Sequence, residues 1–355
     1  MNKRQAVNVA APGKLILLGE YAVLEGAPAL VMAVNRHARA SVETVDGPWL
    51  FNAPNLKMAY IPFSVTSSGI VRFDKGIPSE TLYKLTFFKT TLEYTLRYIL
   101  KSGHELYPLG ITLDTGAFYD RQLQAKLGFG SSAALTVAVT RAVLRMFGVG
   151  DADRARLFRL ALAAHKQAQS GMGSGVDVAA SAYGGVLQYR VYLDPQARQE
   201  APVPVKEWTS LPLLCVFTGH SESTRRMVGG VRRLREARPA VFDALMRELG
   251  AVSTAGIRAY SQQDKTAFLS AVDAFYERLM RLGKESGMPI ISPVHQHLAD
   301  WARQTGCVYK PSGAGSGDVG VAFAPDMEKL NRLKKLIEQY GLASVPIAIG
   351  RITAP

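Results

Sequence analysis

The spacing of hydrophobic residues predicts alternating strands and helices along the first half of the chain. Apolar side chains recur every three or four positions over residues 82–100, which is typical of an amphipathic helix. Helices are also predicted at 131–147 and 153–170, with Asp151 or Asp153 as the N-cap of the second. Short runs with β-branched residues predict strands at 7–10, 29–34, 38–45, 110–114 and 186–192.

A polar, proline-containing stretch at residues 194–204 is the predicted boundary between two halves of the chain. The elements predicted beyond it are a buried strand at 211–218, helices at about 224–249, 265–286 and 327–340, and strands at 319–324 and 343–349. A chain of 355 residues is longer than one hydrophobic core usually serves. We therefore predict an α+β protein of two layered domains.

Charge and composition limit the partners that the protein can have. Its 42 Lys and Arg exceed its 29 Asp and Glu, which gives a net charge of +13. That excess is compatible with nucleic acid, an anionic membrane surface or an anionic small substrate. Because the basic residues are dispersed, and the chain has neither a nucleic-acid module nor a long uncharged apolar stretch, we expect no nucleic-acid and no membrane partner. Two cysteines and the lack of a signal peptide favour a cytoplasmic location.

The strongest chemical signal is a glycine-rich turn before the helix predicted at 131–147. The segment KLGFGSSAAL contains Gly128 and Gly130, which permit tight turns, followed by Ser131 and Ser132. The first N–H groups of a helix lack internal partners and lie at the positive end of its dipole, so they can bind phosphate. A tight turn capped by serine is the alternative, and the usual P-loop spacing is absent.

Three further segments combine glycine with reactive side chains. APGKLILLGEY places Lys14 at the mouth of a core strand, where it is either an edge residue or a charge in a cleft. KPSGAGSGDVGVAF is a loop whose amides can surround an anion, with Asp318 capping its own backbone as the simpler interpretation. In the segment over residues 165–189, Asp177 follows two glycines and is either a functional carboxylate or a helix N-cap.

Taken in order, these segments resemble the motifs of the GHMP kinase superfamily, which is named for galactokinase, homoserine kinase, mevalonate kinase and phosphomevalonate kinase. The resemblance extends over residues 10–323. It implies the GHMP kinase fold, with the active site in a cleft between two domains. Residues 1–200 would form the ATP-binding N-terminal domain, which is ribosomal protein S5 domain 2-like, and residues 201–355 a ferredoxin-like α+β domain. Residues 52–80 carry no motif, and their position alone suggests a flap over the cleft.

Within the superfamily, the phosphomevalonate kinase branch is the preferred resemblance. AQSGMGSGVDVAASAYGGVLQYR and FTGHSESTRRMV are similar to that branch. Mevalonate kinases tend to have His where Tyr21 stands and more often Gly where Asp318 stands. The resemblance implies ATP-dependent, Mg²⁺-assisted phosphorylation of 5-phosphomevalonate to 5-diphosphomevalonate on the mevalonate route to isoprenoids. Mevalonate kinase, and a non-catalytic sensor with the same fold, are the alternatives.

The resemblance also implies roles for individual residues. Lys14 and Asp177 are the expected catalytic residues, although an acceptor phosphate that is already ionised has less need of a base. The residues expected to bind ATP are Lys126, Gly128, Gly130, Ser131, Ser132, Ala133 and Ala134. The residues expected to bind the acceptor are Glu20, Tyr21, Ser174, Gly175, Ser221, Ser223, Thr224, Lys310, Ser312, Gly313 and Ala314, with Arg225 and His165 as further candidates.

Ser132 is also the expected Mg²⁺ ligand. Mevalonate kinase carries a glutamate that helps to hold Mg²⁺ some residues before its catalytic Asp, but residues 157–176 of this chain contain no Asp or Glu. Water and nucleotide phosphates would supply the other ligands, as Mg²⁺ commonly allows. The expected partners are therefore ATP and a phosphorylated hydroxy acid, and a homodimer is left open.

Overall fold

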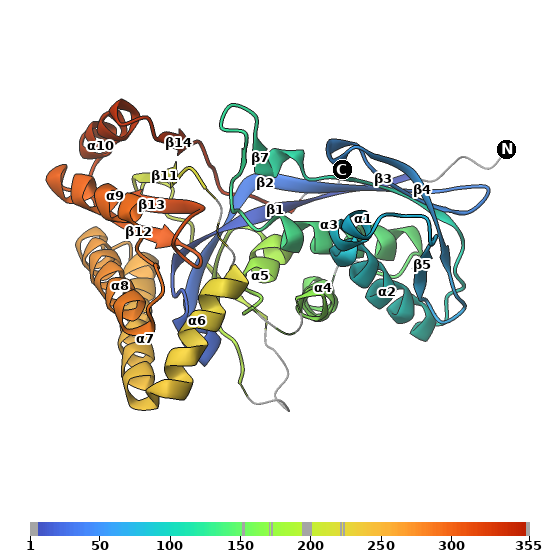
Figure 1. Cartoon of the computed structure of the whole chain (residues 1–355), viewed down its shortest axis with the longest axis horizontal. Helices are drawn as coiled ribbons and strands as arrows, with labels where there is room; N and C mark the ends of the chain where they lie inside the picture. Colours follow the sequence, from blue (N-terminus) through green and yellow to red (C-terminus); the bar gives the residue numbers. More distant parts are fainter. Residues whose placement is uncertain are drawn as a thin grey trace.

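The computed structural model describes residues 6–150, 153–169, 171, 173–193, 201–220, 222 and 224–352. Within these residues the chain forms an eight-stranded sheet, a four-stranded sheet and a two-stranded ribbon, with helices packed against the two larger sheets. Figure 1 shows the first sheet with α2 to α4 on one side of the molecule and the second sheet with α7 to α10 on the other. The predicted α+β class is confirmed.

The first sheet is built around a long antiparallel hairpin of β1 and β2. Its strands are β1 (Ala6–Leu18), β2 (Ala29–Thr44), β3 (Trp49–Ala53), β4 (Met58–Val65), β5 (Val71–Phe73), β6 (Leu109–Asp114), β9 (Val186–Tyr189) and β10 (Val203–Val205). The strand order is β10-β9-β2-β6-β3-β4-β5, with β1 paired to β2. The two strands predicted at 29–34 and 38–45 are one strand, because a register shift opposite Pro12 and Gly13 absorbs the polar residues between them.

Residues 52–80 extend this sheet instead of covering a cleft. They contain the short 3₁₀ helix η2 (Pro54–Leu56) and the strands β4 and β5, which form the edge of the sheet. Figure 1 shows that edge at the end of the molecule that lies far from the second sheet. The flap suggested by sequence position is therefore wrong, because Phe63 and Val71 are buried in the core beneath this edge.

Five helices accompany the first sheet. They are α1 (Ser79–Lys84), α2 (Thr86–Lys101), α3 (Ser131–Met146), α4 (Arg154–Ala168) and α5 (Val176–Tyr183). Helix α3 is apolar on nearly every face because it is buried between β1, β2 and three other helices. Asp153 caps α4 by accepting a hydrogen bond from the Arg156 amide at 3.0 Å, whereas Asp151 lies outside the described residues. The helix predicted at 82–100 is divided at Leu85 into α1 and α2.

The second sheet has the strand order β12-β13-β11-β14. Its elements are β11 (Leu213–Phe217), β12 (Val308–Ser312), β13 (Val319–Phe323), β14 (Ala343–Val345), α6 (Thr224–Ala237), α7 (Pro239–Gln262), α8 (Lys265–Ser286), α9 (Pro293–Gln304) and α10 (Met327–Gln339). The helix predicted at 224–249 is divided at Arg238, because Pro239 starts a new helix. Helix α9 was not predicted from the sequence.

Two segments that follow the predicted boundary in sequence nevertheless pair with the first sheet. Strand β10 follows residue 200 yet pairs with β9 of the first sheet. After β14, residues 346–352 return to the first sheet and form what we call the C-terminal strap. In the strap Ile349 forms a β-bridge with Val34, and the Gly350 amide donates to the Ala33 carbonyl at 2.8 Å. The domain division at residue 200 stays a prediction.

The remaining short elements prepare the chain for α3 and the cavity described below. The ribbon of β7 (Tyr119–Asp120) and β8 (Ala125–Lys126) follows the 3₁₀ helix η3 (Gly116–Phe118) and leads into the glycine-rich turn. A further 3₁₀ helix, η1 (Ala22–Glu25), connects β1 to β2. The ends of β1, β8 and β12 thus deliver their glycine-rich segments to the space between the two sheets.

Candidate active site

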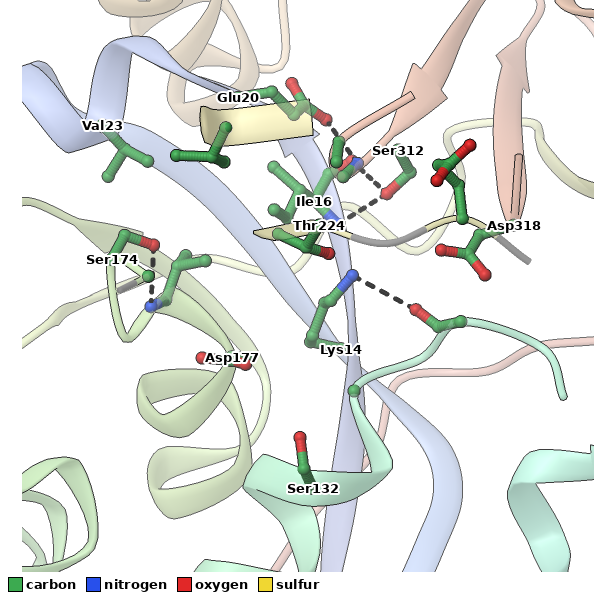
Figure 2. Close-up of a pocket in the computed structure, with 18 of the residues that line it drawn as sticks. Lys14, Ile16, Glu20, Val23, Ser132, Ser174, Asp177, Thr224, Ser312 and Asp318 are labelled. Carbon is green, nitrogen blue, oxygen red and sulfur yellow. Dashed lines mark hydrogen bonds between the residues drawn. The ribbon is translucent and has the colours of Figure 1, made fainter. Parts of the chain in front are cut away.

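A cavity of about 290 Å³ lies where the four glycine-containing segments meet. Its lining comes from β1 and η1, the turn before α3, the loop before α5, the start of α6, and the loop between β12 and β13. Figure 2 shows Lys14 at its centre, with Ser132 and Asp177 on separate helices and Ser312 and Asp318 on the opposite side. The structure therefore brings together segments that are up to about 300 residues apart in sequence.

The turn before α3 forms one wall of the cavity. Gly128 and Gly130 both have left-handed backbone angles, with φ of 68° and 76°, and Gly130 is the N-cap of α3. A Cβ atom on Gly128 would lie 2.5 Å from the Cβ atom of Asp318, so glycine is needed for this close approach. Lys126, Ser131 and Ser132 also line the cavity, whereas Ala133 and Ala134 are buried behind it.

Lys14 lies on β1 directly beside this turn. Its amide donates to the Phe129 carbonyl at 2.8 Å, and its Nζ atom donates to the Gly128 carbonyl at 3.3 Å. The turn and the strand are thereby joined by two hydrogen bonds. The Lys14 side chain points into the cavity, with its ammonium group directed toward the Gly128 carbonyl (Figure 2).

Asp177 projects from the first turn of α5 into the cavity. Gly175, with φ of 83°, is the N-cap of this helix, so the alternative interpretation of Asp177 as the cap is wrong. Asp177 and Lys14 flank Gly130, since a Cβ atom built there would be 3.6 Å from the Asp177 Cβ and 3.2 Å from the Lys14 Cγ. Ser174 lines the cavity and its Oγ accepts a hydrogen bond from the Val176 amide at 3.3 Å.

A buried ion pair closes the end of the cavity near the second sheet. Lys310 Nζ lies 2.5 Å from Glu20 Oε1 and also donates to the Ile16 carbonyl at 3.3 Å. Burial lowers the pKa of Lys310, and the adjacent Glu20 carboxylate opposes that shift. Lys310 does not line the cavity, but Glu20 does, and its Oε2 atom has no hydrogen-bond partner among the described residues. The Gly313 amide donates to Oε1 at 3.4 Å.

Two more side chains fasten the loop after β12 to the end of β1. Ser312 Oγ accepts from the Ile16 amide at 3.0 Å and donates to the Ile16 carbonyl at 2.9 Å. Tyr21, which has a left-handed φ of 60°, donates its hydroxyl hydrogen to the Ala314 carbonyl at 2.5 Å. Burial, reinforced by the charges of Glu20 and Glu222, raises the pKa of Tyr21, so this hydroxyl stays a donor.

The other residues expected from the sequence are distributed as follows. Thr224 lines the cavity at the start of α6, together with Gly313 and Ala314, whereas Gly175 does not. Ser221 and Ser223 lie outside the described residues. Arg225 is exposed and does not line the cavity, and His165 is buried beneath it.

Sequence reasoning did not single out Gln169 and Glu222, which also line the cavity. Each is a lone polar residue inside a segment that was noticed for its glycines or serines. The spacing of these two residues therefore gave no signal. Their places within segments that were already recognised could have suggested that they line the cavity.

The charges facing the cavity are mixed. Lys14 and Lys126 are its lining cations, and Glu20, Asp177, Glu222 and Asp318 are its lining carboxylates. Glu20 is paired with Lys310, and Glu222 with Arg226 at 2.8 Å. No group of three or more His, Cys, Asp or Glu residues in the described part of the chain is arranged to hold a metal ion. None of the helices described is long and apolar enough to span a membrane.

Comparison with known proteins agrees with this architecture. Residues 88–185, which contain the turn before α3 and Asp177, match the family model described as the GHMP kinases N terminal domain. This chain carries a GHMP kinase N-terminal domain. It is 28% identical to the phosphomevalonate kinase of Streptomyces sp. over 95% of each chain. It is also 28% identical to the mevalonate kinase of Thermococcus gammatolerans over 91% of this chain and 90% of the relative.

Solved structures extend the GHMP kinase fold to nearly the whole chain. The Lin0012 protein from Listeria innocua superposes with a TM-score of 0.88 at 25% identity, covering 99% of each chain. Streptococcus pneumoniae phosphomevalonate kinase, in complex with phosphomevalonate and AMPPNP, superposes with a TM-score of 0.79 at 19% identity, covering 98% of this chain and all of the other. The GHMP kinase resemblance of the sequence motifs is therefore confirmed, while the relatives are divided between two acceptors.

Proposed function

We propose that this protein is an ATP-dependent kinase that phosphorylates 5-phosphomevalonate to 5-diphosphomevalonate on the mevalonate route to isoprenoids. The observation that carries the proposal is the cavity that Lys14, the N-terminus of α3 and Asp177 all line. The similarity to the Streptomyces phosphomevalonate kinase over nearly the whole of both chains supports the choice of acceptor.

The wall before α3 is suited to the phosphates of ATP. The free amides at the N-terminus of α3 and the positive end of its dipole attract anions, and Gly128 and Gly130 allow the backbone to approach the ligand closely. Lys126 and Lys14 add two positive charges to the same wall. Phosphoryl transfer depends mainly on alignment and on neutralising charge, and these groups are placed to supply both.

Lys14 and Asp177 are the residues that we expect to face the transferred phosphoryl group. Lys14 would stabilise the negative charge on that group in the transition state. Asp177 would orient the acceptor, and it would take the acceptor proton only where the acceptor oxygen carries one. A phosphate acceptor that is already ionised relies on the orienting role alone.

The acceptor would occupy the end of the cavity formed by Glu20, Tyr21, Ser174, Thr224 and the loop at 312–314. The unpaired Oε2 atom of Glu20 is positioned to accept a hydrogen bond from a hydroxyl group. Lys310 would act from behind the cavity, through its ion pair with Glu20. The roles expected for Gly175, Ser221 and Ser223 stay predictions.

The side chains near the turn before α3 fit a magnesium ion bound together with the nucleotide. Mg²⁺ prefers oxygen ligands and usually keeps several waters while it binds substrate phosphates. The Ser132 hydroxyl on this wall and the Asp177 carboxylate on the neighbouring wall both line the cavity, and we propose that they hold the ion. When bound, Mg²⁺ would screen the negative charge of the phosphates. Lys14 and the α3 amides would bind and orient the same phosphates independently.

Mevalonate kinase is the second candidate, and the charge of the cavity favours it. A phosphorylated acceptor brings a dianion toward ATP, which calls for additional cations. The described lining has two lysines against four carboxylates, and two of those carboxylates are neutralised by Lys310 and Arg226. The near-equal identity to the Thermococcus mevalonate kinase agrees with an uncharged hydroxyl as the acceptor.

A coupled ADP-release assay on the purified protein, with mevalonate and 5-phosphomevalonate tested side by side, decides between the acceptors. We expect kcat/KM to be at least about 100-fold higher with 5-phosphomevalonate, a difference of about 2.7 kcal/mol in transition-state stabilisation. Phosphorus NMR of the product should then show a diphosphate. The reverse ratio would establish the mevalonate kinase alternative. Turnover with neither acceptor would exclude both.

A further inference from the structure

His165 lies beneath the cavity and contacts two of its functional side chains. It belongs to the last turn of α4, and its side chain is 2% exposed. Its Nε2 atom is 3.2 Å from the Ser132 hydroxyl oxygen and 3.9 Å from Asp177 Oδ2. The ring of Phe87 packs against the imidazole, with a centroid separation of 5.3 Å.

This position lies between two walls of the cavity that belong to different helices. Ser132 is in the first turn of α3, and Asp177 is in the first turn of α5. Figure 2 shows the two side chains facing the cavity from these separate helices. The Nε2 atom of His165 lies close to both side chains, so it can fix the position of the turn that carries Ser132 relative to Asp177.

We infer that His165 is a positioning residue that holds the Ser132 hydroxyl and, through its proximity to Asp177, aligns the two walls of the cavity. The inference rests on the proposed kinase function. His165 acts through Ser132 and does not touch the acceptor, because its ring is buried and absent from the cavity lining. This replaces the role at the acceptor that the sequence suggested for it.

Loss of the imidazole nitrogen frees the Ser132 rotamer. A serine hydroxyl without a fixed partner populates several staggered rotamers, so the fraction of molecules with correctly placed oxygen falls. A phenylalanine at position 165 would keep a ring packed on Phe87 but would remove the hydrogen bond. The expected defect is therefore one of alignment, and such losses lower kcat more than they change substrate affinity.

A double-mutant cycle with Ser132→Ala and His165→Phe tests the coupling. We expect each single substitution to lower kcat about 10- to 100-fold. The kcat of the double variant should match that of the less active single variant within about threefold. The acceptor KM should stay within about twofold of wild type in His165→Phe. A buried residue with a merely structural role would give losses that multiply.

Two amide substitutions provide a matched rescue. The side-chain amide of His165→Gln reaches the position of Nε2, whereas that of His165→Asn is too short to do so. We expect the Gln variant to retain kcat within about fivefold of wild type and the Asn variant to resemble His165→Phe. Equal activity in the two variants would contradict a role at the Nε2 position, even if the Phe variant folds poorly.

Nucleotide binding gives a readout that needs no turnover. Calorimetry with AMPPNP and Mg²⁺ should show about fivefold weaker binding in His165→Phe than in wild type, with no further weakening when Ser132→Ala is added. Multiplicative losses in both assays would overturn the inference while leaving an active wild type, and therefore the proposed function, intact. A wild type that transfers phosphate to neither acceptor overturns the proposed function, and this inference with it.

Discussion

Lys14 lies where three glycine-rich segments approach one another. Its Nζ atom contacts the Gly128 carbonyl, its stem passes Gly130, and a Cβ atom on Gly313 would be 3.7 Å from Nζ. Side chains at these glycines would fill the space that the lysine and a ligand must share. The reactivity that we propose for Lys14 is therefore created by the absence of neighbouring side chains as much as by its charge.

Neutral substitutions of the catalytic candidates should separate activity from stability. Lys14→Met keeps the length of the stem, and Asp177→Asn keeps the shape of the carboxylate, so each should lower kcat by about 10²- to 10⁴-fold. The melting temperature should change by less than a few degrees. Lys101→Met on the exposed end of α2 serves as the control and should keep wild-type kcat. Near-normal turnover in the Lys14 or Asp177 variant would refute the assignment.

Individual residues also show what the sequence could and could not predict. The glycine-rich motifs predicted which segments meet, because glycines that permit close approach leave a recognisable pattern. The motifs could not show that Lys310 pairs with Glu20, since these residues are 290 positions apart in the sequence. A lysine in a phosphate-binding motif thus proved to be a buried partner of a carboxylate.

At the scale of elements, helix α9 supports the loop between β12 and β13. Its residue His295 is fully buried, accepts a hydrogen bond from the Tyr309 hydroxyl at Nδ1 (2.8 Å), and donates from Nε2 to the Gly317 carbonyl at 3.4 Å. Gly320 lacks a side chain that would overlap the Tyr309 hydroxyl. Burial lowers the pKa of His295 to about 3, so the neutral ring that this network needs is maintained.

Because the pKa of His295 is lower in the folded protein than in the unfolded chain, the free energy of unfolding should depend on pH. An unfolded histidine binds a proton below about pH 6.5, whereas the folded one does so only near pH 3. Stability should therefore be full above pH 6.5 and fall as the pH decreases toward 3, with a contribution of about 1.4 kcal/mol per pH unit. Urea unfolding between pH 6 and 4.5 should show about 2 kcal/mol less pH dependence in His295→Gln than in wild type.

His297→Gln provides a matched control for this measurement, because His297 is exposed on the same helix. It should keep the wild-type pH dependence. Equal slopes for wild type and His295→Gln would show that the buried imidazole is not the source.

Helices were predicted with correct bounds where the hydrophobic pattern and the capping residues indicated the same first and last residues. Helix α8 matches its predicted bounds at Lys265–Ser286, because Asp264 caps it and Gly287 ends it in a left-handed conformation. Helix α9 was missed although its buried residues, His295, Leu298, Ala299 and Ala302, recur at helical spacing. Its burial depends on a histidine whose partners lie on β12 and in the loop after it.

At the scale of the whole molecule, the C-terminal strap connects the second sheet back to the first. In addition to the bridge at Ile349, the Asn35 amide donates to the Ala348 carbonyl at 3.0 Å, and the Gly185 amide donates to the Gly350 carbonyl at 2.9 Å. The buried contacts of Glu20 and Ser312 join the same halves across the cavity. The relative position of the cavity walls is thus fixed at both ends.

A methyl group in the strap should weaken this connection. A Cβ atom on Gly350 would overlap the Val34 carbonyl, which is backbone and cannot rotate away. We expect Gly350→Ala to lower the free energy of unfolding by about 1–3 kcal/mol and to reduce kcat as the walls lose alignment. Gly76→Ala, which meets no atom within 4 Å, should change stability by less than about 0.5 kcal/mol. Equal stability of the two variants in urea unfolding would exclude a constraint by the strap.

During translation, the first sheet can be completed only after the strap has been synthesised, long after the first strands of that sheet. Asn35 and Ala348 are 313 positions apart, so at about 5–20 residues per second the ribosome makes them roughly 15–60 s apart. For that time the backbone groups of residues 33–35 that the strap will bind are exposed to water on a nascent chain whose hairpin has already emerged. Residues that are synthesised long after β1 and β2 thus complete the sheet that these two strands begin.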